Sequence, residues 1–158
     1  NPLNIFCIPI PNHKDKIDIY DCFDLFCKPE VLSGDNKWKY EKDNKYYNVY
    51  KTLSIWKLPS VLIIHLKRFD NFGNKINKFV DIPLHLDMEK YCVGYNTNKS
   101  KFKLFSICNQ IGNLNSGHYY SYCKDNDNWL NFDDINVSLI EEKNIVTKNA
   151  YILFYKKC

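Results

Sequence analysis

The order of hydrophobic and polar positions divides the chain into strands and one early helix. Residues 3–10 are mostly apolar and end in a segment with two prolines, which predicts a strand that stops there. After Asp18, whose carboxylate suits a helix N-cap, apolar positions recur at helical spacing. Because Pro29 disfavours helical geometry at Lys28, we expect this helix to end near that residue.

Further along, the apolar period changes to two, which is typical of strands. Residues 49–56 alternate between two faces, and Val61–Leu66 form a continuous apolar run that suits a strand buried on both faces. Four further strands are predicted at Lys101–Asn109, His118–Lys124, Asn128–Phe132 and Tyr151–Tyr155. With a second short helix at Glu141–Ile145, the pattern predicts a single α+β domain over residues 1–158, built mostly on antiparallel sheet.

Composition and charge narrow the class of protein. The chain has 158 residues, of which 45% are hydrophobic and 25% charged, so it is long and apolar enough to bury a core. Its net charge is only +4. Lysines and aromatic residues alternate between Lys37 and Tyr50, which leaves a nucleic-acid-binding domain open as an alternative. Because acidic residues are interleaved there, we favour solvated loops and expect no nucleic-acid partner.

The cysteine pattern indicates a reducing environment. Seven cysteines are present, without any CxxC pair, and the first residues lack the basic and apolar regions of a secretory leader. No stretch approaches the ~18 apolar residues that span a bilayer. We therefore expect reduced, mostly buried thiols, no membrane association, and a cytoplasmic or nuclear location.

One histidine has neighbours suited to proton transfer. His118 follows Gly117 at the start of a predicted strand, and its ordinary pKa near 6.5 suits exchange of a proton at cellular pH. Asp133 lies fifteen residues later, across a short polar turn, so an antiparallel hairpin would bring its carboxylate to the imidazole, most commonly at Nδ1. Asp134 is the fallback, although its side chain should point to the other face. Spacing alone leaves equally open a surface histidine beside an Asp-Asp turn.

Four ordered motifs together resemble a known family. The first motif consists of "NSGHYYSY", "NWLNFDDINV" and "AYILFY", and it is similar to the histidine box and last strand of the ubiquitin-specific proteases, which are papain-like deubiquitinating enzymes. The segments "YKTLSIWKLPSVLIIHLKRFD", "IYDCFDLFCKPEVLSGDNKW" and "FVDIPLHLDMEKY" resemble the same family's central stretch, short helix and following segment. The similarity runs from Leu3 to Tyr155 and implies a partial papain-like fold, with residues of about 30–50 forming the fingers extension.

The resemblance also implies residue roles. His118 would be the general base that deprotonates a cysteine, Asp133 would orient it, and Asp134 would support the same site. Gly117 and Tyr119 would line the slot that admits the Gly-Gly tail of ubiquitin. The resemblance places Phe69 in that groove as well, although packing in the core is an alternative for a phenylalanine at a strand end.

The chain departs from the family pattern at the nucleophile. The family's box of the form G-N-T-C-x-x-N, with its cysteine and oxyanion-stabilising asparagine, is absent. We therefore expect the nucleophilic cysteine and the thumb segment to lie outside this chain, which would be the C-terminal fingers and palm part and inactive alone. Neither Cys108 nor Cys123 is expected to substitute, because the first lies in an apolar alternation and the second faces away from His118.

Two further departures concern the fingers and one loop. Family members often hold a structural zinc with two CxxC pairs, whereas Tyr40 and Asp43 stand where the first pair would fall, so we expect no metal and no cofactor. The family often has His-Ser-Gly where this chain has Asn109, Gln110 and Ile111. Because this loop is expected to border the substrate groove, the polar contacts of the groove should differ from those of the family.

These observations favour a deubiquitinating cysteine protease that cleaves after the terminal glycine of ubiquitin, with ubiquitin and ubiquitinated proteins as partners. The main alternative is a catalytically inactive ubiquitin-binding or scaffold module of the same fold. The residue pattern that separates them is the retained His118 and Asp133, since a pure binding module needs no base.

Overall fold

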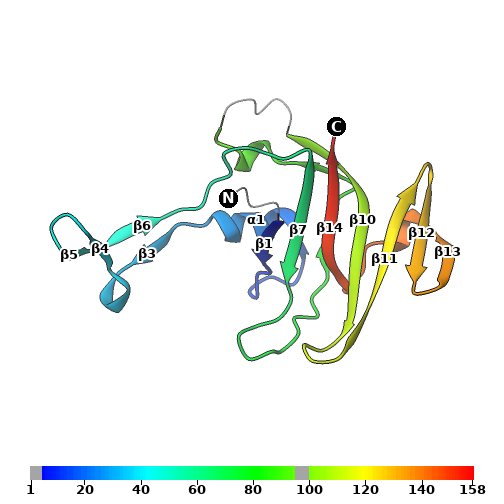
Figure 1. The fold of residues 1–158 in the computed structure, drawn as a ribbon, viewed down its shortest axis with the longest axis horizontal. Helices are drawn as coiled ribbons and strands as arrows, with labels where there is room; N and C mark the ends of the chain where they lie inside the picture. The colour runs from blue at the N-terminus through cyan, green and yellow to red at the C-terminus, as the bar shows by residue number, and fades with distance from the viewer. Residues whose placement is uncertain (1–4, 95–99) are drawn as a thin grey trace.

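A computed structural model describes residues 5–94 and 100–158, and its main feature is one long, mostly antiparallel sheet (Figure 1). The sheet order is β1-β7-β14-β10-β11-β12-β13, with β9 also paired to β10. Only the pairing of β1 with β7 is parallel within it. Its strands are β1 Ile5–Pro9, β7 Val61–Lys67, β9 His85–Asp87, β10 Lys101–Gly112, β11 Gly117–Asp125, β12 Asn128–Asp133, β13 Asn136–Ile140 and β14 Ala150–Lys157.

The remaining elements are short. A parallel pair joins β2 to β8, and two antiparallel pairs, β3–β6 and β4–β5, form an arm that projects away from the sheet (Figure 1). These elements are β2 Ile17–Asp18, α1 Ile19–Cys27, β3 Glu30–Leu32, β4 Trp38–Tyr40, β5 Lys45–Tyr47, β6 Val49–Lys51 and β8 Val80–Asp81. Single 3₁₀ turns occupy Gly34–Asn36, Glu89–Tyr91 and Glu142–Asn144. The arm thus corresponds to the segment for which the resemblance implied a fingers extension.

The helix α1 is fixed by its own first residues and by the sheet. The carboxylate of Asp18 accepts from the backbone N–H of Asp21, and the carboxylate of Asp21 accepts from the backbone N–H of Asp18, which makes a reciprocal capping box. A cap of this kind contributes about 1 kcal/mol. The helix ends at Cys27, one residue before the predicted limit, because Pro29 follows.

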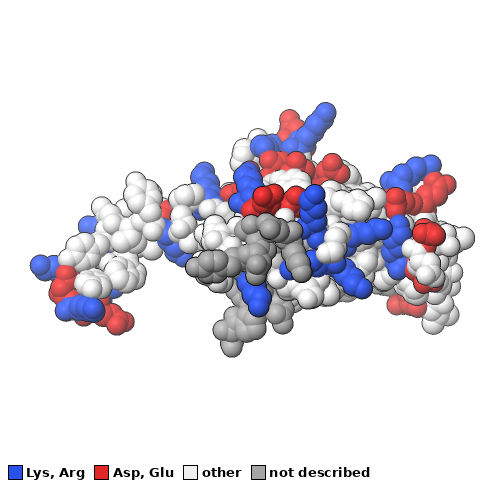
Figure 2. Space-filling model, turned by 90° about the horizontal axis from the view of Figure 1, so that it is seen from above, with Lys and Arg blue, Asp and Glu red and all other residues white. Residues whose placement is uncertain are grey.

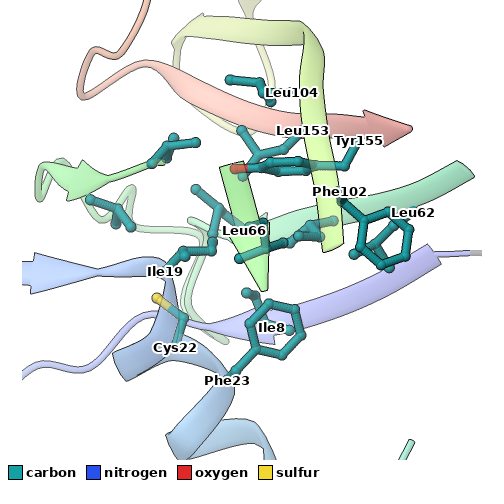
Figure 3. Packing of buried hydrophobic residues seen from close by; sticks show 14 of the residues in the cluster. Ile8, Ile19, Cys22, Phe23, Leu62, Leu66, Phe102, Leu104, Leu153 and Tyr155 are labelled. Carbon is teal, nitrogen blue, oxygen red and sulfur yellow. The ribbon is translucent and has the colours of Figure 1, made fainter. Parts of the chain in front are cut away.

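The core lies between α1 and one face of the sheet (Figure 3). Ile19, Cys22 and Phe23 project from the helix toward apolar side chains on four neighbouring strands. The strand residues in this layer include Ile8, Leu62, Leu66, Phe102, Leu104, Leu153 and Tyr155, each at most 1% exposed. Alternation along β7 is regular, with even-numbered residues buried from Leu62 onward. The apolar periodicity of the sequence therefore places this layer correctly.

The structure differs from the sequence-based elements at several points. The first strand is described only from Ile5, and residues 3 and 4 of its predicted range lie outside the described residues. Of residues 49–56, which alternate in sequence, only Val49–Lys51 form a strand. This strand, β6, belongs to the arm, and the chain leaves the arm after it. The short helix predicted at Glu141–Ile145 is a single 3₁₀ turn, Glu142–Asn144, and not an α-helix. Asn136–Ile140, which was not predicted, pairs with β12 as the edge strand β13.

Hydrogen bonds and aromatic contacts hold the outer hairpin of the arm, which has no cysteine or histidine for a zinc ion. No cysteine or histidine lies between Cys27 and His65, so the arm lacks the N and S donors that a closed zinc site needs. Instead, the carboxylate of Asp43 accepts from the Tyr47 hydroxyl at 2.5 Å and from the Lys45 backbone N–H at 3.0 Å. Tyr40 packs between Trp38 and Tyr47, with ring centroids 5.4 and 6.5 Å away.

This arrangement predicts that metal removal has no effect on the arm. A protein with a structural zinc loses folding free energy when a chelator strips the ion. Here we expect the thermal unfolding midpoint to stay within about 1 °C when EDTA or 1,10-phenanthroline is added in excess. A clear fall of the midpoint in chelator, restored by added zinc, would contradict the expectation.

Charged side chains are mixed in sign over the visible surface (Figure 2). Basic and acidic residues lie side by side on the arm and over the sheet, and several form exposed pairs, such as Lys51 with Glu30 at 2.6 Å. A continuous basic stripe, which nucleic-acid binding requires, is not seen among the described residues on this face. No helix in the described part of the chain combines the length and apolar character needed to cross a bilayer.

Candidate active site

The candidate site lies where β11 and β12 separate. In the ladder between these strands, Ser121 pairs with Phe132 at one end and Asp125 pairs with Asn128 at the other. His118 and Asp133 both lie just beyond the Ser121 end. There His118 Nε2 is 2.5 Å from Asp133 Oδ1, and the two side chains are 43% and 45% exposed. The nitrogen is therefore Nε2 and not the expected Nδ1. Within the described residues Nδ1 has no hydrogen-bond partner, so it is free to meet a reacting group.

Asp134 lies closer to this pair than its strand position suggests. A two-residue turn, Asp134–Ile135, connects β12 to β13, and the backbone of Asp134 has φ 51° in the left-handed region. This turn conformation brings a carboxylate oxygen of Asp134 within 4.8 Å of the ligand atoms of His118 and Asp133. The expectation that Asp134 points to the other face is therefore wrong, because the residue is in a turn and not in a strand.

The electrostatics of the site make the imidazole of His118 more basic than usual. The hydrogen bond that His118 donates to the Asp133 carboxylate raises the pKa of His118 above 6.5, partial desolvation opposes this, and the charges of Asp133 and Asp134 raise it further. The three side chains are also the one group within the described residues whose arrangement could accept a metal ion. The short hydrogen bond already pairs the imidazole with a carboxylate, so the arrangement is complete as a proton-transfer pair.

The direction of the pKa shift can be measured for each histidine separately. We expect an NMR titration of the imidazole C–H signals to give His118 a pKa above 6.5 and His65 a pKa below it, because burial and Lys67 lower the latter. Asp133→Asn should bring the pKa of His118 down and leave that of His65 unchanged. Since the folded pKa of His118 is raised, its contribution to stability is complete below about pH 6.5 and is lost as the pH rises through the folded value. An unchanged pKa of His118 in Asp133→Asn would contradict this account.

Gly117 is required by a close backbone approach. A Cβ at this position would lie 2.5 Å from the carbonyl oxygen of Ile111 and 2.6 Å from Nε2 of Gln110. Gly117 pairs with Gly112, whose φ of 102° also excludes most side chains. The two glycines allow β10 and β11 to close tightly just before His118.

Tyr119 and Phe69 meet through a third aromatic residue. Tyr119 is 56% exposed and Phe69 is half-buried, and each ring centroid lies 6.2 Å from that of Tyr151. The ring of Tyr151 also packs edge-on against His65 at 4.6 Å. Phe69 therefore lies in this aromatic group and not in the main core, which was the alternative. The sequence did not predict that Tyr151 joins this aromatic group, although the residue lies in the segment "AYILFY" that carries the family resemblance.

Neither candidate cysteine approaches His118. Cys108 pairs with Ser121, three residues along β11 from the histidine, and Cys123 lies five residues along the same strand, so both occupy the opposite face. Burial raises the pKa of the Cys108 thiol, which makes it a poor nucleophile. One Cys–His contact was not anticipated: Cys7 Sγ lies 3.4 Å from Nδ1 of His65, on the paired strands β1 and β7.

Comparison with known proteins shows the family of this chain. A family model described as ubiquitin carboxyl-terminal hydrolase matches residues 11–155. Ubiquitin carboxyl-terminal hydrolase 9 of Arabidopsis thaliana is 36% identical over 150 residues, which are 91% of this chain and 16% of that protein. Ubiquitin carboxyl-terminal hydrolase 15 of Homo sapiens is 34% identical over 153 residues, which are 93% of this chain and 16% of that protein.

Solved structures extend the agreement to the fold. The SAGA Ubp8/Sgf11/Sus1/Sgf73 DUB module bound to ubiquitin aldehyde contains a chain that matches with a TM-score of 0.80 and 33% identity, over 98% of this chain and 36% of that one. A variant of the same module, bound to monoubiquitin, also matches with a TM-score of 0.80 and 34% identity, over 98% of this chain and 35% of that one. This chain thus spans 16% of the length of each of the two curated relatives. It belongs to the ubiquitin carboxyl-terminal hydrolase family, within the ubiquitin-specific proteases, and has their papain-like α+β fold.

Proposed function

We propose that this chain provides the base and the orienting carboxylate of a deubiquitinating cysteine protease. The observation that carries the proposal is the His118–Asp133 pair, which bonds through Nε2 and leaves Nδ1 open. A base of this kind needs one nitrogen held in a fixed tautomer and the other free for the reacting proton. Matching structures of the family that are bound to ubiquitin aldehyde and to monoubiquitin support ubiquitin as the partner.

The chemistry follows from this arrangement. His118 Nδ1 takes the proton of a cysteine thiol, and the thiolate attacks the carbonyl carbon of the terminal glycine of ubiquitin. The C–N bond breaks as the imidazolium returns its proton to the leaving amine, and a thioester remains. Water then gives a proton to Nδ1 and its oxygen attacks the thioester, which releases the ubiquitin carboxylate and restores the thiol. Asp133 stabilises the imidazolium formed in both steps, and Asp134 adds a second negative charge nearby.

The same proposal assigns the substrate groove. Gly117 and Tyr119 would line the slot for the Gly-Gly tail, and Phe69 would extend it through the contact that both aromatic residues make with Tyr151. The exposed face of Tyr119 offers apolar contact area there.

The nucleophile is proposed to lie outside this chain, in a thumb segment that precedes it, so the chain alone would be inactive. Ubiquitin with an electrophile at its C-terminus, such as a propargylamide, tests this, because it forms a covalent bond with the catalytic cysteine. We expect mass-spectrometric mapping to find the label, in the full-length protein, at a cysteine outside the 158 residues, and to find none on this chain alone. Labelling of Cys7, Cys108 or Cys123 would overturn this assignment of the nucleophile.

A ubiquitin-binding module without catalysis is the second candidate, and it is favoured by the separation of Cys108 and Cys123 from His118. It predicts that the full-length protein binds ubiquitin and does not react with the electrophilic probe. For location, we propose the cytoplasm or nucleus, supported by seven free cysteines and no disulfide among the described residues.

A further inference from the structure

The loop that leads into the candidate base is held by its own first residue. Asn113–Ser116 connect β10 to β11 and end two residues before His118. The side-chain oxygen of Asn113 accepts from the backbone N–H groups of Asn115 at 3.0 Å and Ser116 at 2.8 Å, and the Asn113 N–H donates to the Ser116 carbonyl at 2.9 Å. These bonds give a four-residue loop one closed conformation.

A buried glutamine joins this loop to the sheet. Gln110 is 2% exposed, and its Nε2 donates to the carbonyl oxygens of Ile111 at 3.0 Å and Asn113 at 3.3 Å. Its backbone N–H donates to the Asn149 carbonyl at 2.9 Å, and its own carbonyl accepts from Lys75 Nζ at 2.6 Å. Gln110 therefore connects the loop, the beginning of β14 and the segment after β7 at one point.

The side chain of Gln110 also lies directly over the backbone before His118. Nε2 would be only 2.6 Å from a Cβ at Gly117, so the missing side chain of Gly117 is what gives the amide its place. The amide thus packs against the peptide that carries His118. Any displacement of the loop at Asn113 would move this contact and with it the start of β11.

A second loop lies beside the first one (Figure 1). At Gly73 a Cβ would meet Leu114 Cδ2 at 3.3 Å, so the tips of the loops after β7 and after β10 lie close to each other. Asp70 closes its own loop by accepting from the backbone N–H groups of Phe72 and Asn74 at 2.9 and 2.8 Å. Lys75, at the end of this loop, provides the bond to Gln110, so both loops are connected to the same residue.

We propose that Gln110 is a positioning residue that holds the Asn113–Ser116 loop, and through Gly117 the backbone of His118, in a fixed conformation before substrate binds. For catalysis this inference rests on the proposed function, because it assumes that the loop borders the substrate groove. A loop ordered in advance loses less conformational entropy when substrate binds. The residue acts through Asn113 and Gly117 and does not touch the reacting atoms.

Amide hydrogen exchange on this chain tests the positioning without any activity. Gln110→Met keeps the side-chain length and donates no hydrogen bond, and losing such a bond corresponds to about fivefold to tenfold faster local opening. We therefore expect exchange at Asn115 and Ser116 to accelerate by at least that factor. Exchange in β14 should not change.

Asn109→Leu is the matched control. Asn109 is the neighbouring residue, is fully buried, and its side-chain amide has no hydrogen-bond partner among the described residues, so an apolar replacement should leave loop exchange unchanged. Unchanged loop exchange in Gln110→Met, or equal acceleration in both variants, would overturn the proposal.

Kinetics of the full-length protein connect the loop to its function. For a ubiquitin-derived substrate, Gln110→Met should raise KM about fivefold to tenfold, since loop order is then gained only on binding, and the pH profile of kcat should stay as in the wild type. A fall in kcat with unchanged KM would contradict the positioning role. If the wild-type protein cleaves no ubiquitin substrate, the proposed function fails, and the exchange measurement still decides whether Gln110 orders the loop.

Discussion

His118→Ala in the full-length protein should lower kcat for a ubiquitin-derived substrate by about 10²- to 10⁴-fold, the usual contribution of a general base. The physical reason is that a cysteine with an ordinary pKa near 8.5 is mostly protonated at about pH 7 and needs an acceptor for its proton. His118 Nδ1 is the open acceptor at this site. The measurement is the steady-state rate of release of a fluorescent amine from the C-terminus of ubiquitin.

The neighbouring acids provide graded comparisons. Asp133→Asn retains a hydrogen-bonding side chain beside Nε2 but removes its charge, so the variant should lose less activity than His118→Ala. It should also lower the pKa of the rate profile, since the carboxylate is the main cause that raises the pKa of His118. His85, an exposed residue of β9, is the matched histidine control, and its alanine variant should keep full activity. Wild-type rates in His118→Ala would rule out its assignment as the base.

The largest effect on stability is expected at Arg68. This side chain is fully buried; its Nε donates to the Ala150 carbonyl at 2.6 Å, and its Nη1 donates to the carbonyls of Ile76 and Lys78 at 3.0 and 2.8 Å. No carboxylate pairs with it within the described residues, and burial lowers its pKa to about 10. Leaving one buried acceptor without a donor costs about 1–3 kcal/mol, so Arg68→Leu should reduce the free energy of unfolding by about 3 kcal/mol or more.

Urea denaturation monitored by tryptophan fluorescence measures this loss. Domains of this size are stable by about 5–15 kcal/mol, so Arg68→Leu should move the midpoint far toward zero urea. Lys67→Ala is the matched control, because the adjacent Lys67 is exposed and its removal should change stability by at most about 0.5 kcal/mol. Arg68→Lys should also be destabilised, since an ammonium group cannot reproduce the planar donor geometry of guanidinium. A midpoint equal to the wild type in Arg68→Leu would refute the structural role.

Local patterns predicted the parts of the fold that depend on neighbouring residues. The capping carboxylate and the proline limit α1 because both act within one helical turn. The turn at Asn126 connects β11 to β12, and a hairpin that short brings residues fifteen positions apart to the same end. The spacing therefore allowed His118 to pair with Asp133, and it left a surface histidine beside an Asp-Asp turn equally open.

Alternation failed where tertiary context decides the outcome. Residues 49–56 have the period of a strand, yet only Val49–Lys51 form one, because their partner is the short strand β3 in the arm. Beyond the arm, Ile55 makes an isolated bridge to Cys92. Conversely, Asn136–Ile140 gave no signal, since this edge strand exposes apolar side chains on one side and is defined by its partner β12.

The sequence by itself determined most of the main strands along the chain, the capped helix α1 and a hairpin that could bring an imidazole to a carboxylate at one end. Only the tertiary structure decided which ring nitrogen bonds, that Asp134 turns toward the site, that Tyr151 joins Phe69 and Tyr119, and that Arg68 is buried. Each of these depends on atoms that folding brings together: Arg68 Nε, for example, donates to the carbonyl of Ala150, 82 residues away. A periodic pattern can place a side chain on a face, but it does not contain the position of a carbonyl on a distant strand.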